Sequence, residues 1–294
     1  MEPYFKNDDF AIYNADCMEV CRSMPDNSID MVLTSPPYKS TRVWKAIGDD
    51  AEEDAGERKG GSSKSNTRKN NLTKRYDDFL DTRTDEEYVD DTVALFLEFD
   101  RLLKPNCIVL YNISWGGGLS LKGTQVHTDV MHAVFHRTPF YVADTIVWRK
   151  ANAMPDNQSP NMCTRIWEPV WVCCRASERA TFRANKKKSS VRKDNNQQLY
   201  EPFYSYIEAA NNDGATELNK CTYSTELCDK LLGYYADEEM RRSGGVVFDP
   251  YNGTGTTGVS CLKIGMKYIG AEISAKQCEY SVSRLRKPQQ GLLF

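Results

Sequence analysis

The sequence has little histidine and no long apolar run. Its 294 residues include three histidines, so hydrolases that need a histidine base beside a G-x-S-x-G serine are disfavoured. No stretch approaches the roughly 20 apolar residues that cross a bilayer, and the first ten residues lack the basic and apolar regions of a signal peptide. We therefore expect an intracellular, soluble protein of the cytoplasm or nucleoid, with no membrane partner.

Metal-binding patterns and an overall basic charge are also missing. The 10 cysteines show no C-x-x-C spacing, and His132 and His136 lie four apart without an evident third ligand. We expect reduced, mostly packed cysteines and no metal. The formal net charge of −3 is not the basic excess typical of nucleic-acid binding, so such a partner would have to be bound by local basic segments.

Apolar periodicity predicts strands that alternate with helices. Helices are expected at 85–103, 125–137 and 225–235, and buried strands at 30–34 and in "CIVLYNIS", "YVADTIVWRK", "RIWEPVWVCCR", "GVVFD" and "KYIGAEI". This alternation indicates an α/β fold with a mostly parallel sheet. Two polar segments interrupt it. Residues 40–76 have an acidic block followed by basic residues, and 176–221 have a basic run followed by aromatic residues. Loops of this length are either disordered or functional.

A glycine-rich turn, "FDPYNGTGTTG" at 248–258, follows a predicted strand and opens a helix. Gly253, Gly255 and Gly258 satisfy G-x-G-x-x-G, but the lysine of a phosphate-binding P-loop is missing, which excludes a nucleotide triphosphatase of that type. Glu272 ends the next strand, about where a ribose-binding acid is expected. The turn fits a dinucleotide or any other adenosine-bearing cofactor.

The stretch "TSPPY" at 34–38 ends a buried strand with two residues that cannot continue a ladder. The Ser35 oxygen and the Pro36 carbonyl could together accept both hydrogens of an exocyclic amino group, which would aim the nitrogen lone pair at an electrophile. Tyr38 offers a flat face on which a base could stack. Because a stacked duplex base cannot reach such a pocket, this chemistry implies a flipped-out base.

At these residues the sequence resembles the beta group of amino-directed, S-adenosylmethionine-dependent DNA methyltransferases. The catalytic motif precedes the cofactor motif, as in the circularly permuted members. The resemblance implies an α/β, Rossmann-like methyltransferase fold, with a mostly parallel sheet, helices on both faces and an antiparallel edge hairpin. It divides the chain into a catalytic domain at 1–175 and 222–294, a target-recognition insert at 176–221, and a flexible charged loop at 40–76. One departure is the missing Lys-Pro pair before the glycine turn.

The resemblance also assigns residues to roles. Those implied in catalysis are Ser35, Pro36, Pro37 and Tyr38. Those implied in binding S-adenosylmethionine are Asp16, Cys17, Ser35, Ser224, Thr225, Asp249, Pro250, Tyr251, Gly253, Gly255, Thr256, Thr257, Glu272 and Ile273. Those expected to contact DNA are Arg42, Arg179, Arg183, Lys186, Lys187, Lys188, Arg192 and Lys193.

Ser-Pro-Pro-Tyr usually accompanies methylation of cytosine N4 in this family, and Asp-Pro-Pro-Tyr that of adenine N6. We therefore expect a site-specific methyltransferase acting on cytosine N4 of double-stranded DNA, with adenine N6 as the alternative. A nicotinamide-dependent oxidoreductase and a catalytically silent DNA-binding protein are more distant alternatives. A cognate restriction endonuclease is a candidate partner, and the chain is expected to be a monomer or homodimer.

Overall fold

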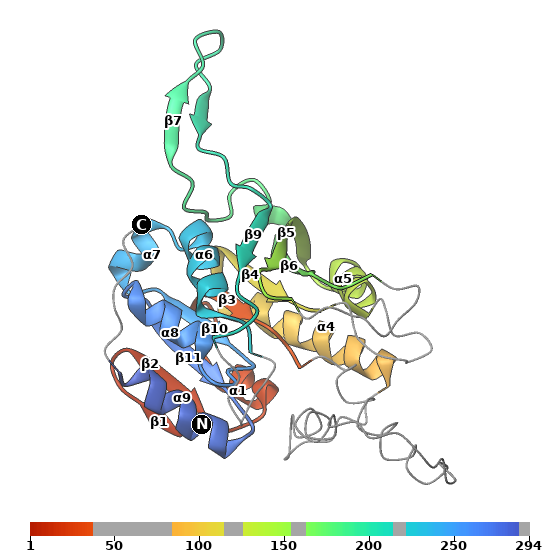
Figure 1. Cartoon of the computed structure of the whole chain (residues 1–294), viewed down its shortest axis with the longest axis vertical. Helices are drawn as coiled ribbons and strands as arrows, with labels where there is room; N and C mark the ends of the chain where they lie inside the picture. Colours follow the sequence, from red (N-terminus) through yellow and green to blue (C-terminus); the bar gives the residue numbers. More distant parts are fainter. Residues whose placement is uncertain (38–83, 115–125, 154–162, 214–221, 288–294) are drawn as a thin grey trace, which may run out of the picture.

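One nine-stranded sheet organises the chain (Figure 1). The computed structural model describes residues 1–37, 84–114, 126–153, 163–213 and 222–287, so Tyr38, Arg42 and the 40–76 segment lie outside the described residues. In spatial order the strands are β1 (Phe5–Lys6), β2 (Phe10–Tyr13), β11 (Lys267–Ala271), β10 (Val246–Asp249), β3 (Ile29–Thr34), β4 (Leu103–Asn112), β6 (Trp167–Arg175), β5 (Phe140–Lys150) and β9 (Tyr206–Ala209).

The strand directions confirm the predicted fold class. Strands β2, β11, β10, β3 and β4 are parallel to one another. Strands β5 and β6 form an antiparallel pair toward one end of the sheet, and β6 is also antiparallel to β4. Beyond this pair, β9 runs parallel to β5 as the outermost strand. Strand β9 comes from the segment 176–221, so part of the predicted insert completes the main sheet.

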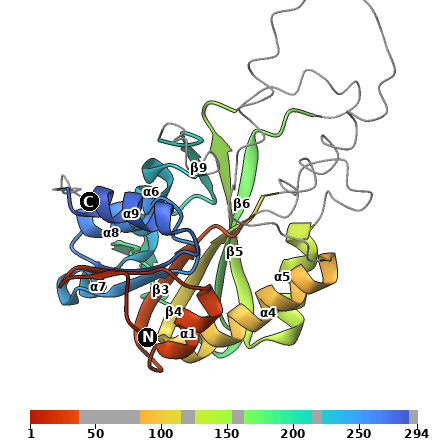
Figure 2. The same cartoon turned by 90° about the horizontal axis from the view of Figure 1, so that it is seen from below.

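Helices cover both faces of the sheet (Figure 2). Helices α1 (Cys17–Ser23), α4 (Asp85–Leu102) and α5 (Val126–Arg137) pack together on one side, and α6 (Thr225–Tyr235), α8 (Thr256–Lys263) and α9 (Ala275–Leu285) on the other. Helix α7 (Glu238–Ser243) precedes β10. Local signals explain several boundaries: Thr84 and Glu87 form a capping box at α4, and Gly244 ends α7 in the left-handed region.

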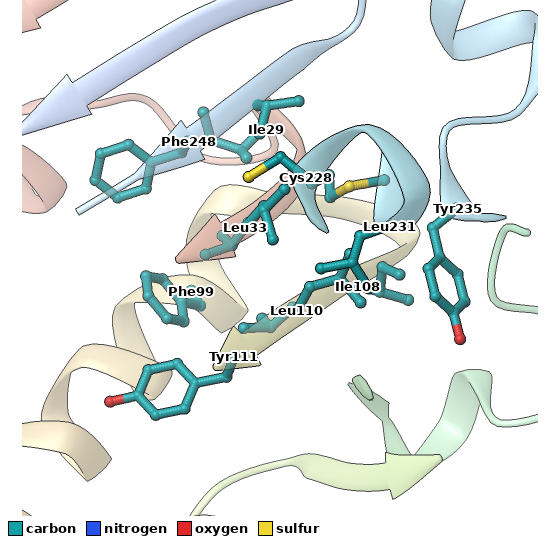
Figure 3. Packing of buried hydrophobic residues seen from close by; sticks show 14 of the residues in the cluster. Ile29, Leu33, Phe99, Ile108, Leu110, Tyr111, Cys228, Leu231, Tyr235 and Phe248 are labelled. Atoms are coloured by element: carbon teal, nitrogen blue, oxygen red, sulfur yellow. The ribbon is translucent and has the colours of Figure 1, made fainter. Parts of the chain in front are cut away.

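The core lies on both sides of β3 and β4, whose apolar residues are buried. Figure 3 shows Phe99 of α4 against one face of these strands and Leu231 of α6 against the other. Such continuous apolar runs are typical of parallel strands covered on both faces. Seven of the described cysteines are buried, in agreement with their expected packing role. None of the helices in the described segments has the length and apolarity needed to span a bilayer.

A second, two-stranded sheet stands apart from this body. Strands β7 (Lys188–Val191) and β8 (Gln198–Tyr200) pair antiparallel, after the 3-10 turn η1 (Ala176–Glu178). Figure 1 shows this hairpin projecting from the rest of the molecule.

Candidate active site

The carboxyl ends of the parallel strands bring the predicted motifs together. Asp16 follows β2, Ser35 follows β3, Asp249 ends β10 and Glu272 follows β11. Because these four strands are neighbours and parallel, all four residues lie along one edge of the sheet, which is where open α/β sheets bind ligands. The structure thus brings the ends of these four strands, which carry the predicted motifs, to the same edge.

Asp249 joins the two motifs. Its buried carboxylate accepts hydrogen bonds from Thr34 Oγ1 at 2.6 Å, from Thr257 Oγ1 at 2.7 Å and from the Tyr251 amide at 3.0 Å. Tyr223 donates a longer bond of 3.4 Å and is also hydrogen-bonded to Thr257. Burial raises the pKa of Asp249 although these bonds favour its charged form. One carboxylate therefore fixes the end of β3, just before Ser35, against the start of the glycine turn.

The glycine turn needs its glycines for two different reasons. Gly253 and Gly255 have φ values of 52° and 79°, in the left-handed region that favours glycine. Gly258 lies inside α8, where an added Cβ would lie 2.6 Å from a ring carbon of Tyr268 and 2.8 Å from Leu285. The first two glycines shape the loop, and the third lets α8 pack closely on β11.

Substitution of Gly258 by alanine should isolate this packing effect. Alanine favours a helix interior over glycine by about 1 kcal/mol, so local propensity alone would stabilise the variant. We expect instead a net destabilisation of about 1–3 kcal/mol from the overpacked contact with Tyr268. Urea denaturation measures it, and a Gly258→Ala chain as stable as the native one would show that α8 can shift away without cost.

Acidic and apolar groups flank the turn. Glu272 accepts hydrogen bonds from the amides of Gly253 and Ser274, both at 2.9 Å, and burial raises its pKa. Asp16 caps α1 through the Met18 amide at 2.8 Å and is exposed. Ile273 is 49% exposed beside Glu272. An apolar surface next to two carboxylates suits an adenosine. The purine would pack on the apolar side chain, and the ribose hydroxyls would donate hydrogen bonds to a carboxylate.

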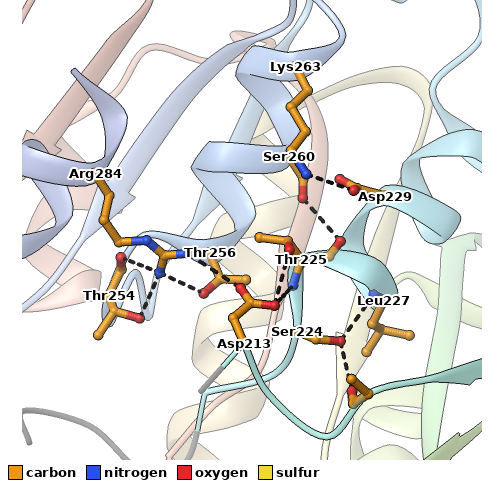
Figure 4. Close-up of polar contacts among 11 residues, drawn as sticks. Asp213, Ser224, Thr225, Leu227, Asp229, Thr254, Thr256, Ser260, Lys263 and Arg284 are labelled. Atoms are coloured by element: carbon orange, nitrogen blue, oxygen red, sulfur yellow. Dashed lines mark hydrogen bonds and ion pairs between the residues drawn. The ribbon is translucent and has the colours of Figure 1, made fainter. Parts of the chain in front are cut away.

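Other predicted cofactor residues are already engaged within the chain (Figure 4). The buried Ser224 hydroxyl donates to the Ala210 carbonyl at 2.8 Å and caps α6 through Leu227. The Thr225 hydroxyl lies 3.1 Å from Asp213, and the Thr256 hydroxyl accepts from Arg284 at 3.2 Å. The Thr256 hydroxyl thus braces the glycine turn through Arg284, and the Ser224 and Thr225 hydroxyls fix the start of α6. Direct contact with the cofactor stays a prediction for all three.

Sequence reasoning missed the two charged residues in this brace. Arg284 of α9 donates to the Thr254 carbonyl at 3.0 Å and lies 3.4 Å from Asp213, which in turn accepts from the Thr225 amide at 2.8 Å. They link the glycine turn, α9 and the start of α6. No local motif marks either residue, since each reads as an ordinary surface charge.

The described part of the Ser-Pro-Pro-Tyr motif lies beside a tyrosine that sequence reasoning also missed. Ser35 and Pro37 are half-buried, and Pro36 is buried. The Pro37 carbonyl accepts a hydrogen bond of 3.1 Å from the buried Tyr88 hydroxyl of α4. This bond and the Thr34 bond to Asp249 fix the segment from both sides. The carbonyls of consecutive prolines are therefore held in place without any competing N–H donor.

The predicted DNA-contacting residues fall into two groups. Arg183 is in ion pairs with Asp237, at 3.1 Å, and Glu239, and Arg179 lies over the Tyr141 ring at 5.4 Å, so both are on the body. The other described members are exposed on and next to β7 and β8: Lys186, Lys187, Lys188, Arg192 and Lys193.

The fold and the joined turn define an α/β protein with a site suited to an adenosine-bearing cofactor at the carboxyl ends of its parallel strands. A family model for DNA methylases matches residues 29–283, and the chain belongs to this family of amino-directed, N4-cytosine or N6-adenine DNA methyltransferases. Its cofactor is S-adenosylmethionine, which sets aside the nicotinamide-dependent alternative. The enzymatic class also sets aside a silent DNA-binding protein.

Individual relatives agree with the family. The type II methyltransferase M.HinfI of Haemophilus influenzae is 24% identical over 278 residues, 94% of this chain and 68% of its own length. The PvuII DNA methyltransferase (cytosine-N4-specific) has a TM-score of 0.66 at 14% identity, covering 97% of this chain and 89% of its own. TTHA0409 of Thermus thermophilus, complexed with S-adenosyl-L-methionine, has a TM-score of 0.56 at 17% identity, covering 96% and 95%. The two structures share the fold.

Proposed function

We propose that the protein methylates the exocyclic N4 amino group of cytosine at specific sites in double-stranded DNA. The observation that carries the proposal is Ser35, a serine where aspartate would favour adenine N6, held at the strand end beside the cofactor turn. The fold likeness to the cytosine-N4-specific PvuII enzyme supports the same choice.

The cofactor would be held by the groups around the glycine turn. Glu272 would accept hydrogen bonds from the ribose hydroxyls, and Ile273 would cover the purine. Asp16 would contact the cofactor from the end of β2. When bound, S-adenosylmethionine supplies a methyl group on a positively charged sulfur. The residues on the neighbouring strand end, Ser35 and Pro36, then face the acceptor base.

The protein's contribution to the reaction is orientation. The Ser35 oxygen and the Pro36 carbonyl accept the two amino hydrogens, so the nitrogen lone pair leaves conjugation with the ring. The freed lone pair of this nitrogen would then be available to accept the methyl group that the bound cofactor would supply. The nitrogen then loses a proton through the Ser35 hydroxyl to solvent. No strong base is needed, because the charged nitrogen is itself a strong acid.

The substrate base must leave the duplex, at a cost of a few kcal/mol. Tyr38 would stack on the flipped base, and the segment 176–221 would select the sequence around it. Arg179, Arg183 and Arg42 would add contacts to phosphates. We further propose that a restriction endonuclease recognising the same sequence is the functional partner. Because each strand can be methylated separately, the working form is a monomer or a homodimer.

The Glu272 contact predicts how cofactor affinity depends on pH. The ionised carboxylate accepts hydrogen bonds more strongly than the protonated acid, in which one oxygen carries a donor O–H, and burial raises the pKa of Glu272 above its usual 4.5. Affinity should therefore fall as the pH drops through this raised pKa. Glu272→Gln should bind S-adenosylmethionine about 10- to 100-fold more weakly and without this pH dependence. Calorimetric titration at several pH values measures the affinity and its pH dependence. Equal affinity of the variant and the native protein would show that Glu272 does not contact the cofactor.

Blocking one acceptor at a time tests the choice of base. Mixed-sequence DNA is amplified with N4-methyl-dCTP or with N6-methyl-dATP, and each product is offered with labelled S-adenosylmethionine. We expect the first DNA to accept little label and the second to accept nearly as much as unmodified DNA. The reverse pattern would assign the enzyme to adenine, and no label in unmodified DNA would overturn the proposal.

A further inference from the structure

The hairpin that contains β7 and β8 extends well beyond the body (Figure 1). We call residues 186–202 the arm. Every residue of the arm is exposed except Gln198, which is half-buried. An isolated two-stranded hairpin has little stability of its own in water. A partner that covers its faces would therefore stabilise it.

The root of the arm is fixed to the C-terminal end of α6. Asn185 donates from its backbone amide to the Tyr234 carbonyl at 2.7 Å and from Nδ2 to the Gly233 carbonyl at 2.9 Å. At the returning strand, the Phe203 ring stacks on Tyr234, with centroids 4.3 Å apart and planes within 5°. Both ends of the arm are thus anchored, so the body sets the direction in which it points.

The charge of the arm favours a polyanion. It holds five basic residues and two acidic ones in a chain whose net charge is −3. Three of the basic residues, Lys186, Lys187 and Lys188, adjoin the root, where Lys186 lies 5.7 Å from the Phe203 ring centre. A second copy of the chain is disfavoured as the occupant, because pairing two arms would bring like charges together.

The tip carries the side chains that distinguish bases. A backbone bond of 2.9 Å from Arg192 to Gln197 closes the turn, and Asn196 has a left-handed φ of 55°. Arg192 makes one ion pair, of 3.3 Å, with the exposed Asp194. The loop so formed presents Arg192, Lys193 and the amides of three further residues: Asn195, Asn196 and Gln197. Arginine and lysine read guanine edges, and asparagine and glutamine read adenine edges.

We propose that the arm enters the major groove of the substrate duplex as a two-stranded ribbon. The major groove is wide enough for such a ribbon, whereas the minor groove is about half as wide. The root lysines would neutralise phosphates at the groove edges, while the tip contacts base edges. The inference rests on the proposed function and adds to it which element selects the sequence and from which groove.

Binding to a labelled mixed-sequence duplex, measured by fluorescence anisotropy at several salt concentrations, tests the root. Lys187→Ala/Lys188→Ala should weaken binding to all sequences and lower the salt slope by about two. The control, Arg22→Ala/Lys267→Ala, removes the same charge from two exposed sites, in the last turn of α1 and the first residue of β11. It should keep the native slope. Equal slopes for the arm variant and the native protein would overturn the proposal.

Mapping of methylated positions in mixed-sequence DNA tests the tip. Arg192→Ala/Lys193→Ala should lower the preference for the native site over other sites by about 10- to 100-fold. An unchanged site preference would contradict the assignment of the tip. Arm variants that leave DNA binding and site preference unchanged, and change only the molar mass measured by light scattering, would also contradict it. The arm would then contact a second copy of the chain. Native protein that binds DNA in the salt series but transfers no methyl group would contradict the proposed function, not the arm.

Discussion

Replacement of Ser35 by alanine is expected to lower kcat for methyl transfer by about 10²-fold or more, the scale on which one well-placed polar group acts in a transition state. The variant keeps the Pro36 carbonyl but loses the hydroxyl that accepts the second amino hydrogen. Because the proposed role of Ser35 is toward the acceptor base, the dissociation constant for S-adenosylmethionine should change much less than kcat. Single-turnover kinetics with labelled cofactor, together with calorimetric titration, separate these two effects.

Ser35→Asp serves as the matched variant, because it restores a hydrogen-bond acceptor at the same position. It should recover part of the lost turnover. If alanine and aspartate were equally inactive, the loss would reflect a disturbed strand end and not a missing acceptor. Turnover of Ser35→Ala at the native rate would contradict the catalytic role of the hydroxyl.

Asp249→Ala is expected to have the largest effect on stability. It removes the acceptor for the hydroxyls of Thr34, Thr257 and Tyr223 and for the Tyr251 amide in a buried site. Unpaired buried polar groups of this kind should lower the free energy of unfolding by about 3–5 kcal/mol. The glycine turn would also lose its link to β3, so affinity for S-adenosylmethionine should fall. Urea denaturation and calorimetry measure the two losses.

Asp249→Asn keeps one oxygen acceptor and should be less destabilised. Its pH dependence gives a further test. Burial raises the pKa of Asp249 above its usual 3.8. The contribution of this carboxyl to the free energy of unfolding of the native protein therefore falls as the pH rises from 3.8 through the raised pKa. The asparagine cannot ionise, so its deficit relative to the native protein should shrink over the same pH range. A deficit that grew with pH would contradict the raised pKa.

The sequence predicted most of the helices and strands around the sheet, because they follow from local patterns. Continuous apolar runs mark the buried parallel strands, and glycine and proline mark the loops at their ends. Helix α6 begins and ends where its periodicity predicts, at Thr225 and Tyr235. The neighbouring positions of β3 and β10 are established by the fold, and the Thr34 bond to Asp249 shows how closely the two strand ends approach.

Partnerships between distant surface residues could not be predicted. Arg284 and Asp213 are 71 positions apart, and Tyr88 and Pro37 are 51 apart, so only the folded arrangement pairs them. Strand β9 is four residues long and its edge position depends on β5, which no local pattern reveals. The arm lacks the alternating apolar pattern of a half-buried strand, because neither of its faces packs on the body.

The assignment to cytosine N4 is tested by mass spectrometry of nucleosides from mixed-sequence DNA, after incubation with the protein and deuterium-labelled S-adenosylmethionine. We expect labelled N4-methylcytosine, strongly reduced in the Ser35→Ala variant. Labelled N6-methyladenine in its place would contradict the assignment to cytosine that rests on Ser35.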